Sequence, residues 1–401
     1  MRLRTRSQIR KLMLMPYKIL YLVSEDWYFV SHRLPMARAA LRAGYEVHVV
    51  TRIGDCAEQI KHEGFVLHPI HWRRGNMNPI RLLAAILETR RLYRKVRPDL
   101  VHHVAVVPAL IGSLAALRMP IVRLNALAGL GFAFTSNTTM AVAVRPLARF
   151  LLGWLLKRPK TTVLVQNSDD HAVVVKLGVP QERIALIPGS GVDIDVLTPM
   201  PEPSGTFTVG FVGRLLDDKG VSTLVRAHEL LSKRGVSVHT LLAGEPDPSN
   251  PASIPGRALV AWRVIANLRF LGHVDDIRSF WAQAHAAILP SRREGLPKSL
   301  LEAAACGRPL IASDVPGCRE IARHNVNALL VPPDDPEALA HAIVTLMNDP
   351  EMRIRFGRAS RQIVISEFSS ARIGRAIVLL YARLLVETAP SEDRTVGRVI
   401  Q

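Results

Sequence analysis

The chain has 401 residues, 48% of them hydrophobic and 21% charged, and a formal net charge of +18. This length fits two domains of about 200 residues each, and the composition is that of a globular rather than a disordered protein. The three cysteines, Cys56, Cys306 and Cys318, lack metal-ligand spacing, so the sequence predicts neither a disulfide framework nor a zinc site.

The first 16 residues are basic and precede a short apolar run. No small-residue cleavage site follows that run, so we expect a loose extension at residues 1–16 rather than a signal peptide. Nowhere do about 18 apolar residues follow one another, which predicts no membrane span. The few cysteines suit a reducing compartment, so the cytoplasm is the expected location.

The first half of the chain alternates short β-rich runs with segments of helical period. We expect strands at residues 17–24, 46–51, 66–70, 100–104, 121–125 and 162–166, and helices at residues 34–43, 57–63, 79–96, 108–117 and 140–157. Ser168 is the expected cap of a short helix that begins at Asp169. Repeated β-α-β units predict a parallel sheet with helices on both faces.

Residues 196–206 contain three prolines and a glycine, which cannot continue a helix or a central strand and therefore predict a linker. A second β-α-β series follows, with strands expected at residues 208–212, 237–243, 268–272, 286–290, 309–312 and 328–331 and helices at residues 337–347 and 371–387. The predicted fold class is α/β, with two tandem Rossmann-like doubly wound domains that face each other across a cleft.

The expected domains are residues 17–198 and 199–385, and the last helix can pack back on the first of them. A polar tail, residues 386–401, follows. Because doubly wound sheets bind ligands beyond the carboxyl ends of their strands, we expect the ligands in the cleft.

The positive charge is concentrated in the first half. Residues 1–200 carry 28 Lys and Arg against 13 Asp and Glu, whereas residues 201–401 carry 24 against 21. Aromatic residues are few and no nucleic-acid motif occurs, so nucleic acid is not an expected partner. An anionic membrane surface fits better, since each basic residue near one contributes roughly 1 kcal/mol. The alternative is arginine on solvated faces without a partner.

One apolar run, residues 144–160, is flanked by Lys and Arg. Such a run is typical of a helix that lies on a membrane surface. A packing helix with a basic end is the alternative interpretation.

The turn after the first strand of the second half combines glycines with cations. Gly210 and Gly213 flank the strand end, where the backbone would approach a ligand closely. Arg214 follows the strand, and Lys219 lies at the start of the next helix. Two cations beside a helix N-terminus predict a diphosphate site, although surface charges on an ordinary turn would give the same pattern.

A second informative segment joins the fourth expected strand of the second half to the next helix. Glu294 lies in the loop, and Glu302 follows eight residues later, about one turn into the helix. Gly295 shapes the turn, so that the amides of Ser299 and Leu300 point at an anion. A solvated surface position is the alternative for Glu302.

At these residues the chain resembles the retaining glycosyltransferases of the GT-B fold, family 4. The family's E-x7-E pattern corresponds to Glu294 and Glu302. Its G-R pair corresponds to Gly213 and Arg214, and its K-G pair begins at Lys219. Other similar segments are SHRLPMARAALRAGYEVHVVT, VHHVAVVPALIGSLAAL, IPGSGVDID, FLGHVDDI and NALLVPPDDPEALAHAI.

The resemblance implies a role for each matched residue. Arg214 and Lys219 would hold the donor diphosphate and stabilise the leaving group in place of a metal ion, so neither a metal nor a cofactor is expected. Glu302 would bind the ribose hydroxyls, and Glu294 would stabilise positive charge on the transferred sugar. The other expected donor-binding positions are Gly213, His273, Val274, Gly295, Ser299 and Leu300.

Family members often carry a histidine or aspartate after the fourth strand of the first domain, close to the sugar. The match here is His102 and His103, which point to opposite faces of a strand, so that only one reaches the cleft. His103 is favoured because it lies nearer the strand end. His32, at the start of the first helix, and Arg33 are expected on the acceptor side. A purely structural role is the alternative for each histidine.

The first loop, SEDWYFVSHRLP, lacks the glycine-rich turn of many family members. It resembles a subgroup that builds polysaccharide or glycan chains on lipid carriers. The resemblance thus implies a metal-independent, retaining hexosyltransferase in bacterial cell-surface glycan synthesis, such as exopolysaccharide or O-antigen. It would move a hexose or acetamidohexose from a nucleotide sugar, with UDP favoured, to a lipid-linked or polysaccharide acceptor.

Such an enzyme would be a peripheral protein at the inner face of the plasma membrane. The alternative function is a non-catalytic module of the same fold that binds a nucleotide sugar. Loss of Arg214, Lys219, Glu294 or Glu302 would favour that module, and all four are present.

Overall fold

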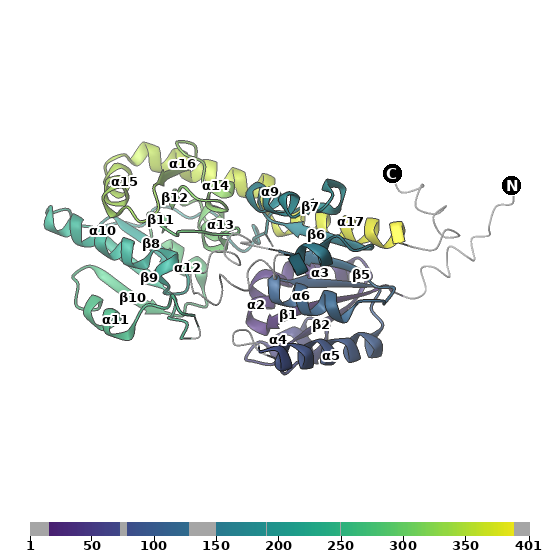
Figure 1. The fold of residues 1–401 in the computed structure, drawn as a ribbon. Helices are drawn as coiled ribbons and strands as arrows, with labels where there is room; N and C mark the ends of the chain where they lie inside the picture. The colour runs from purple at the N-terminus through teal and green to yellow at the C-terminus, as the bar shows by residue number, and fades with distance from the viewer. Residues whose placement is uncertain (1–15, 73–77, 128–149, 190, 249, 389–401) are drawn as a thin grey trace, which may run out of the picture. The chain divides into compact units, whose positions relative to one another are not determined.

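The structure is a computed structural model that describes residues 16–72, 78–127, 150–189, 191–248 and 250–388. The predicted N-terminal extension, most of the polar tail and part of the apolar run at residues 144–160 lie outside these residues. The chain divides into two compact units, Gly191–Arg372 and the remainder, so the segment from Ile373 belongs with the first half of the chain (Figure 1).

The division falls before the proline-containing segment at residues 196–206, not after residue 198. Arginine side chains of the second unit bind the backbone of this segment. Arg361 Nη1 donates to the carbonyl of Leu197 at 2.6 Å, and Arg308 Nη2 donates to that of Pro201 at 2.9 Å. The segment is therefore packed against the second unit.

The first unit is built around a parallel sheet whose seven described strands have the order β3-β2-β1-β4-β5-β6-β7. The strands are β1 (Lys18–Glu25), β2 (Glu46–Arg52), β3 (Val66–Pro69), β4 (Leu100–Val104), β5 (Val122–Ala126), β6 (Thr161–Val165) and β7 (Ile184–Leu186). The helices are α2 (Asp26–His32), α3 (Leu34–Arg42), α4 (Ala57–His62), α5 (Pro79–Val96), α6 (Val106–Ala115), α9 (Ser168–Lys176), the 3-10 turn η1 (Gln181–Arg183) and most of α17 (Ser370–Thr388).

Helices cover both faces of this sheet, which explains why β1 is an almost unbroken apolar run. Tyr21 of β1 packs in a cluster with α3 and with Tyr381 of α17. Leu20 and Leu22 point the other way, into a cluster with α5 and α6. Side chains that alternate along one strand therefore serve two separate cores.

Two local features differ from the sequence predictions. An additional helix, α2, precedes the first predicted one, so His32 ends a helix instead of beginning one. Its aromatic sequence carries little helical signal, but Phe29 is buried in edge-to-face contacts with Tyr21 and Phe65. The cap of α9 is Asn167, whose side chain accepts from the amide of Asp170.

The second unit repeats the design with six described parallel strands in the order β10-β9-β8-β11-β12-β13. The strands are β8 (Thr208–Val212), β9 (His239–Ala243), β10 (Leu268–Gly272), β11 (Ala286–Leu289), β12 (Leu310–Ser313) and β13 (Ala328–Val331). The helical elements are η2 (Asp217–Lys219), α10 (Val221–Lys233), α11 (Gly256–Trp262), α12 (Ile277–Ala282), α13 (Lys298–Ala305), α14 (Cys318–Ile321), α15 (Pro336–Asn348), α16 (Pro350–Ile363) and the π-turn η3 (Val364–Phe368).

Both sheets have the doubly wound order, and the predicted α/β class with two Rossmann-like domains is confirmed. The strand order reverses between β1 and β4 in one sheet and between β8 and β11 in the other. Doubly wound domains bind ligands beyond the carboxyl ends of the strands at this reversal. A ligand site is therefore expected in the loops after these four strands.

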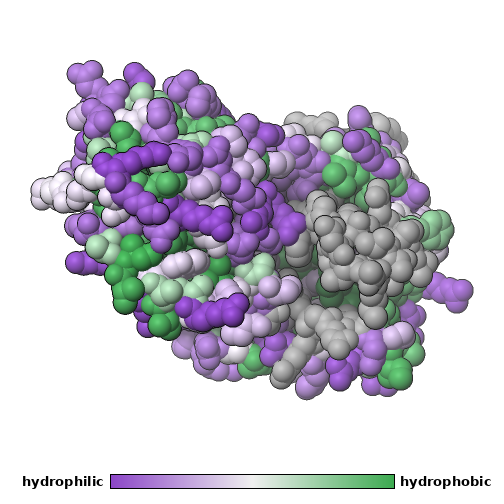
Figure 2. Space-filling model, turned by 60° about the vertical axis from the view of Figure 1, so that its left-hand side comes forward, coloured by the Kyte–Doolittle hydropathy of each residue, from purple (hydrophilic) through white to green (hydrophobic). Residues whose placement is uncertain are grey.

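No helix in the described ranges is long and apolar enough to cross a membrane. Hydrophilic residues cover much of the face drawn in Figure 2, with apolar residues in scattered patches between them.

Candidate active site

A partly buried ion pair lies at the strand reversal of the second unit. Lys219 ends the turn η2 that follows β8, and Glu294 lies in the loop after β11. Lys219 Nζ lies 2.5 and 2.8 Å from the two carboxylate oxygens of Glu294, and the hydroxyl of Ser291 donates to one of them at 2.7 Å. The Glu294 side chain is only 8% exposed. Two residues predicted separately from the sequence are thus in direct contact.

Two glycines hold the backbone around this pair. At Gly220 (φ 73°) a Cβ would lie 2.0 Å from the carbonyl oxygen of Pro290. At Gly317 (φ 79°) it would lie 2.5 Å from the carbonyl oxygens of both Glu294 and Gly295. Only glycine allows both the left-handed backbone and this close approach. Gly317 was not among the predicted site residues, although its DVPG segment lies just after a predicted strand.

We expect Gly317→Ala to displace Glu294 as well as destabilise the fold. A backbone conformation with positive φ costs roughly 1–3 kcal/mol for alanine, and here the methyl group also meets the backbone. The matched control is Gly235→Ala, which has a similar φ of 71° but no atom within 4 Å of its Cβ position. The unfolding temperature and kcat should both fall for Gly317→Ala, whereas Gly235→Ala should lower only the unfolding temperature. Equal kcat values for the two variants would contradict this role.

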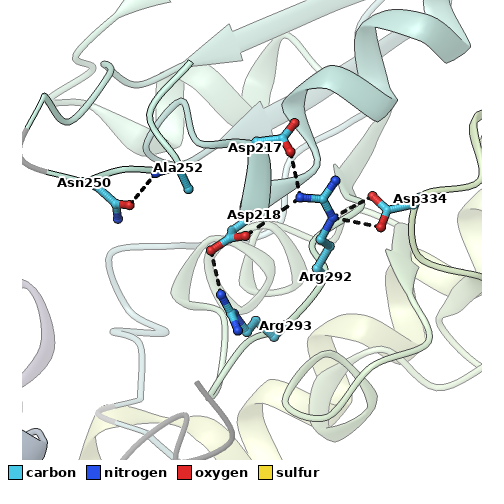
Figure 3. Close-up of polar contacts among 7 residues, drawn as sticks. All are labelled: Asp217, Asp218, Asn250, Ala252, Arg292, Arg293 and Asp334. Atoms are coloured by element: carbon cyan, nitrogen blue, oxygen red, sulfur yellow. Dashed lines mark hydrogen bonds and ion pairs between the residues drawn. The ribbon is translucent and has the colours of Figure 1, made fainter. Parts of the chain in front are cut away.

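A network of ion pairs joins the loop before Glu294 to the turn that carries Lys219 (Figure 3). Arg292 binds Asp217 at 2.6 Å and Asp334 at 2.8 Å, and Arg293 binds Asp218 at 2.8 Å. The hydrogen bonds to Asp334 and Asp217 raise the pKa of Arg292 above its ordinary range. These side chains are partly exposed, so the ion pairs add little to the stability of the fold. Their main effect is to hold the two loops in position relative to each other.

The second predicted cation, Arg214, follows β8 and binds Asp247 at 2.6 Å. Close backbone packing at this strand end involves Gly213, but the position that requires glycine is Gly244. With φ at 135°, a Cβ on Gly244 would lie 1.9 Å from the carbonyl oxygen of Gly213. On Gly213 itself it would make an ordinary contact of 3.4 Å with Phe211. The signal for Gly244 is a glycine immediately after a strand.

Helix α13 begins at Lys298, directly after the loop that contains Glu294. Its N-cap residue, Pro297, makes no side-chain capping bond. The first amides of a helix, here including those of Ser299 and Leu300, have no intrahelical acceptor and favour an anion. Further along, Glu302 is 9% exposed and lies 3.2 Å from Lys298 Nζ. Burial raises the pKa of Glu302, and the charge of Lys298 partly offsets this. An ionised Glu302 is therefore held at an energetic cost.

His273 and Val274 follow β10 at the same edge of the sheet. The amide of Gly244 donates to the carbonyl of Gly272 at 2.7 Å, which brings this loop beside the one after β9. His273 is exposed, and its Nε2 lies 3.3 Å from a carboxylate oxygen of Asp275. The side chain of Val274 packs on the core. All predicted donor-binding residues thus belong to loops or a helix that follow strands of one sheet.

In the first unit, His102 and His103 point to opposite faces of β4, as their alternation predicts, but both are fully buried. His103 is enclosed on the side of α5 and α6. Its Nδ1 donates to Asn125 at 2.7 Å, and its Nε2 accepts from the hydroxyl of Tyr93 at 2.9 Å. Burial lowers its pKa to about 4. Both ring nitrogens of His103 are therefore already used in the core.

His102 lies on the other face, stacked on Tyr21 with ring centroids 4.9 Å apart. Its Nδ1 lies 2.6 Å from the hydroxyl of Tyr381, which also pairs with the hydroxyl of Tyr21 at 2.7 Å. Its Nε2 has no hydrogen-bond partner in the described part of the chain. Burial and then the charge of Arg33 hold the pKa of His102 well below its ordinary value.

Arg33 links α2 to α3 and is only 2% exposed. Its Nη1 donates to the carbonyl of His32 at 2.8 Å, and its Nε has no hydrogen-bond partner among the described residues. His32 stacks on Tyr28 at 4.3 Å. No ion pair is formed by Arg33 with a carboxylate in the described ranges, and a buried cation in that state favours an anionic ligand.

Two protein families match the segments of the chain that contain these candidate site residues. Residues 206–349 match the family described as "Glycosyl transferases group 1", and residues 18–168 match "Glycosyl transferase 4-like". Each of the two units therefore contains a segment that matches a glycosyltransferase family. The group 1 domain contains Arg214, Lys219, Glu294 and Glu302, and the 4-like domain contains both buried histidines and Arg33.

Two glycosyltransferases are similar to this chain over nearly their whole length. The chain is 25% identical to the Staphylococcus aureus capsular polysaccharide biosynthesis glycosyltransferase CapM, over 92% of this chain and 98% of CapM. It is 22% identical to the Campylobacter jejuni N,N'-diacetylbacillosaminyl-diphospho-undecaprenol alpha-1,3-N-acetylgalactosaminyltransferase, over 89% and 98% of the two chains.

Solved glycosyltransferase structures share the fold. Anabaena HepE, determined in complex with UDP and glucose, has a TM-score of 0.74 and 17% identity, over 91% of this chain and 99% of HepE. At this identity the likeness concerns the fold of the two glycosyltransferase domains.

Proposed function

We propose that this chain is a retaining, metal-independent glycosyltransferase that uses a nucleotide sugar to extend a lipid-linked or polysaccharide acceptor of a bacterial surface glycan. The transferred group is a hexose or acetamidohexose, and UDP is the favoured nucleotide. The enzyme works as a peripheral protein at the inner face of the plasma membrane, and its basic first half faces the lipid.

The observation that carries this proposal is the Lys219–Glu294 pair at the reversal between β8 and β11. A donor diphosphate bound there would lie near two cations, Lys219 and Arg214, and the uncapped N-terminus of α13. These groups would neutralise the leaving diphosphate. As Lys219 turns to the phosphate, the carboxylate of Glu294 becomes available to the sugar ring.

Catalysis then comes from positioning and electrostatics. Positive charge develops at the anomeric carbon as the bond to the diphosphate breaks, and Glu294 stabilises it. No second carboxylate in the matched motifs is suited to act as a nucleophile, so the acceptor attacks from the face that the diphosphate leaves. Attack on that face retains the configuration of the anomeric carbon, and the departing phosphate accepts the acceptor's proton.

Donor and acceptor classes are supported by the relatives. The HepE structure holds UDP and glucose, and the name of the Campylobacter enzyme specifies a diphospho-undecaprenol acceptor. Arg33, buried with an unpartnered Nε, suits a phosphate on such an acceptor, and the unpartnered Nε2 of His102 suits a hydroxyl beside it. Between the two predicted histidines, His102 has the better geometry for a ligand, because His103 is saturated within the core.

A panel of UDP, GDP and ADP sugars, scored by thermal shift and by sugar transfer to polyprenyl diphosphate glycans, tests the proposal. A ligand at a hundred times its dissociation constant adds about 2.7 kcal/mol of stability. One donor should both stabilise the protein and be consumed. Stabilisation without turnover by any acceptor would favour the non-catalytic binding module, and no stabilisation by any donor would overturn both functions.

Activity should persist in excess EDTA. The reason is that Arg214 and Lys219 supply the positive charge that a metal provides elsewhere, while the described residues contain no cluster of three or more His, Cys, Asp or Glu side chains that could hold a metal ion. The measurement is the transfer rate with EDTA, before and after magnesium or manganese is added back. Loss of activity that either metal restores would refute metal independence.

A further inference from the structure

A cavity of about 810 Å³ lies in the first unit at the amino ends of the strands. Arg123, the second residue of β5, and Lys160, just before β6, mark this edge of the sheet. The C-terminal end of α6 contributes Leu114 and Leu117. Doubly wound domains bind their reacting ligands at the opposite, carboxyl edge. The cavity is thus separate from the crevice of this sheet.

Five of the eleven described residues that line the cavity are Lys or Arg, and none of these eleven is acidic. One of the cations, Arg90 of α5, is partly engaged, because its Nη1 donates to the carbonyls of Ala115 and Leu117 at the end of α6. The positively charged lining residues are Arg90, Arg118, Arg123, Arg158 and Lys160. Like charges gathered without a carboxylate repel one another, so their arrangement favours a bound anion.

Of these residues, Arg123 gives the strongest indication of an anionic ligand. It is 7% exposed, and its Nε has no hydrogen-bond partner in the described ranges. Its Nη2 donates to the carbonyl of Pro159, and no carboxylate among the described residues forms an ion pair with it. Burial and the nearby charge of Arg158 both lower the pKa of Arg123. A guanidinium in this position is expected to have an anionic partner.

The other residues that line the cavity indicate which class of anion would bind. Arg158 stacks on the ring of Trp154 at 4.1 Å, and leucine, methionine and proline side chains complete the walls. Guanidinium groups bind the oxygens of phosphates through paired hydrogen bonds. The apolar walls suit the carbon chain of a phosphate ester.

We propose that this cavity is a binding site for a phosphate group, either the headgroup of an anionic phospholipid or a small soluble phosphate. The site is independent of the sugar-transfer reaction proposed above. The cations on its rim meet the phosphate first, and Arg123 binds it within the cavity. A lipid headgroup held here would place the amino edge of the first sheet against the membrane.

The test uses the full-length triple variant R118N/R158Q/K160N, whose three positions are exposed. Asparagine suits the left-handed backbone of Arg118 (φ 61°) and Lys160 (φ 59°). The control K233Q/R257Q/R263Q removes three equally exposed charges from the second unit. The probes are vesicles of phosphatidylglycerol with phosphatidylcholine, vesicles of phosphatidylcholine alone, and glycerol 3-phosphate in a thermal-shift titration. Arg123→Met, measured separately, tests the buried cation.

If the ligand is a lipid headgroup, the triple variant should bind phosphatidylglycerol vesicles at least about tenfold more weakly than the control. If it is a soluble phosphate, vesicle binding should be equal, but glycerol 3-phosphate should stabilise the control and not the triple variant. Arg123→Met should follow the triple variant with the same probe. Identical behaviour of the triple variant and the control with every probe would overturn the proposal. Nucleotide-sugar stabilisation should be unchanged throughout, which separates this outcome from failure of the proposed transferase function.

Discussion

Glu294→Gln should lower kcat by roughly a hundredfold or more, with little change in donor binding. The substitution keeps the shape of the side chain and removes the charge that stabilises the sugar as it becomes positive. Glu294 contacts Lys219 and Ser291. Glutamine has nearly the same shape as glutamate and can therefore occupy the same space. Steady-state kinetics with varied donor, together with donor affinity from thermal shift, would separate kcat from binding.

The matched control for this variant is Glu337→Gln. Glu337 also pairs with a basic side chain, Arg234 at 2.6 Å, but both are exposed on the surface of the second unit. Its kinetics should equal those of the wild type. If Glu294→Gln weakened donor binding and left turnover intact, the charge would act in the ground state, and its role would resemble the one proposed for Glu302. Full activity would make Glu294 a structural partner of Lys219 only.

Glu302→Ala should act mainly on the KM for the donor. A carboxylate that binds the ribose does so in the ground state and in the transition state alike, so its removal weakens both equally. A hydrogen bond to a charged group contributes about 1.5–3 kcal/mol, which corresponds to a KM increase of roughly 10- to 150-fold. Initial rates across a donor series, with kcat and KM fitted separately, provide the measurement.

Glu302→Gln adds a stability readout with a definite sign. Burial raises the pKa of Glu302 above 4.5, so the folded state binds its proton more tightly than the unfolded state. Its contribution therefore decreases as pH rises from the unfolded pKa through the folded one, and at pH 7 the ionised group opposes folding. Glutamine avoids this penalty. The Tm of Glu302→Gln at pH 7 should equal or exceed that of the wild type, while donor binding weakens.

A lower Tm for Glu302→Gln at pH 7, with unchanged KM, would indicate instead that the Lys298–Glu302 pair stabilises α13. The pH dependence of Tm checks the same point. Wild type and variant should converge as the solution becomes acidic, because protonated glutamate and glutamine carry the same charge. These two results distinguish a carboxylate retained for a ligand from one retained for folding.

Local sequence signals were sufficient for most of the fold. The strands at residues 208–212, 268–272 and 328–331 have the predicted bounds, because buried parallel strands are short apolar runs that end at polar or glycine residues. Helix α15 contains the predicted helix at residues 337–347, and it begins at Pro336 directly after its cap, Asp335. By contrast, α2 was missed, because the Phe29 side chain of this helix packs on Tyr21 of β1 and on Phe65, which is distant in sequence.

The sequence by itself determined which residues are candidates for the chemistry. The spacing of Glu294 and Glu302 around a loop and a helix start, and the cations after β8, are local patterns that depend on no other part of the chain. Alternation along β4 likewise determined that the two histidines point to opposite faces.

Only the tertiary structure decided which of these residues meet. Lys219 and Glu294 are 75 positions apart and pair because β8 and β11 are neighbours at the reversal of the strand order. His102 meets Tyr381, 279 positions later, because α17 packs on the first sheet. Burial follows from the same packing, and it places the charged side chains of Arg33, Arg123 and Glu302 in the interior. Such contacts depend on the joint packing of distant segments, which no local pattern of residues specifies.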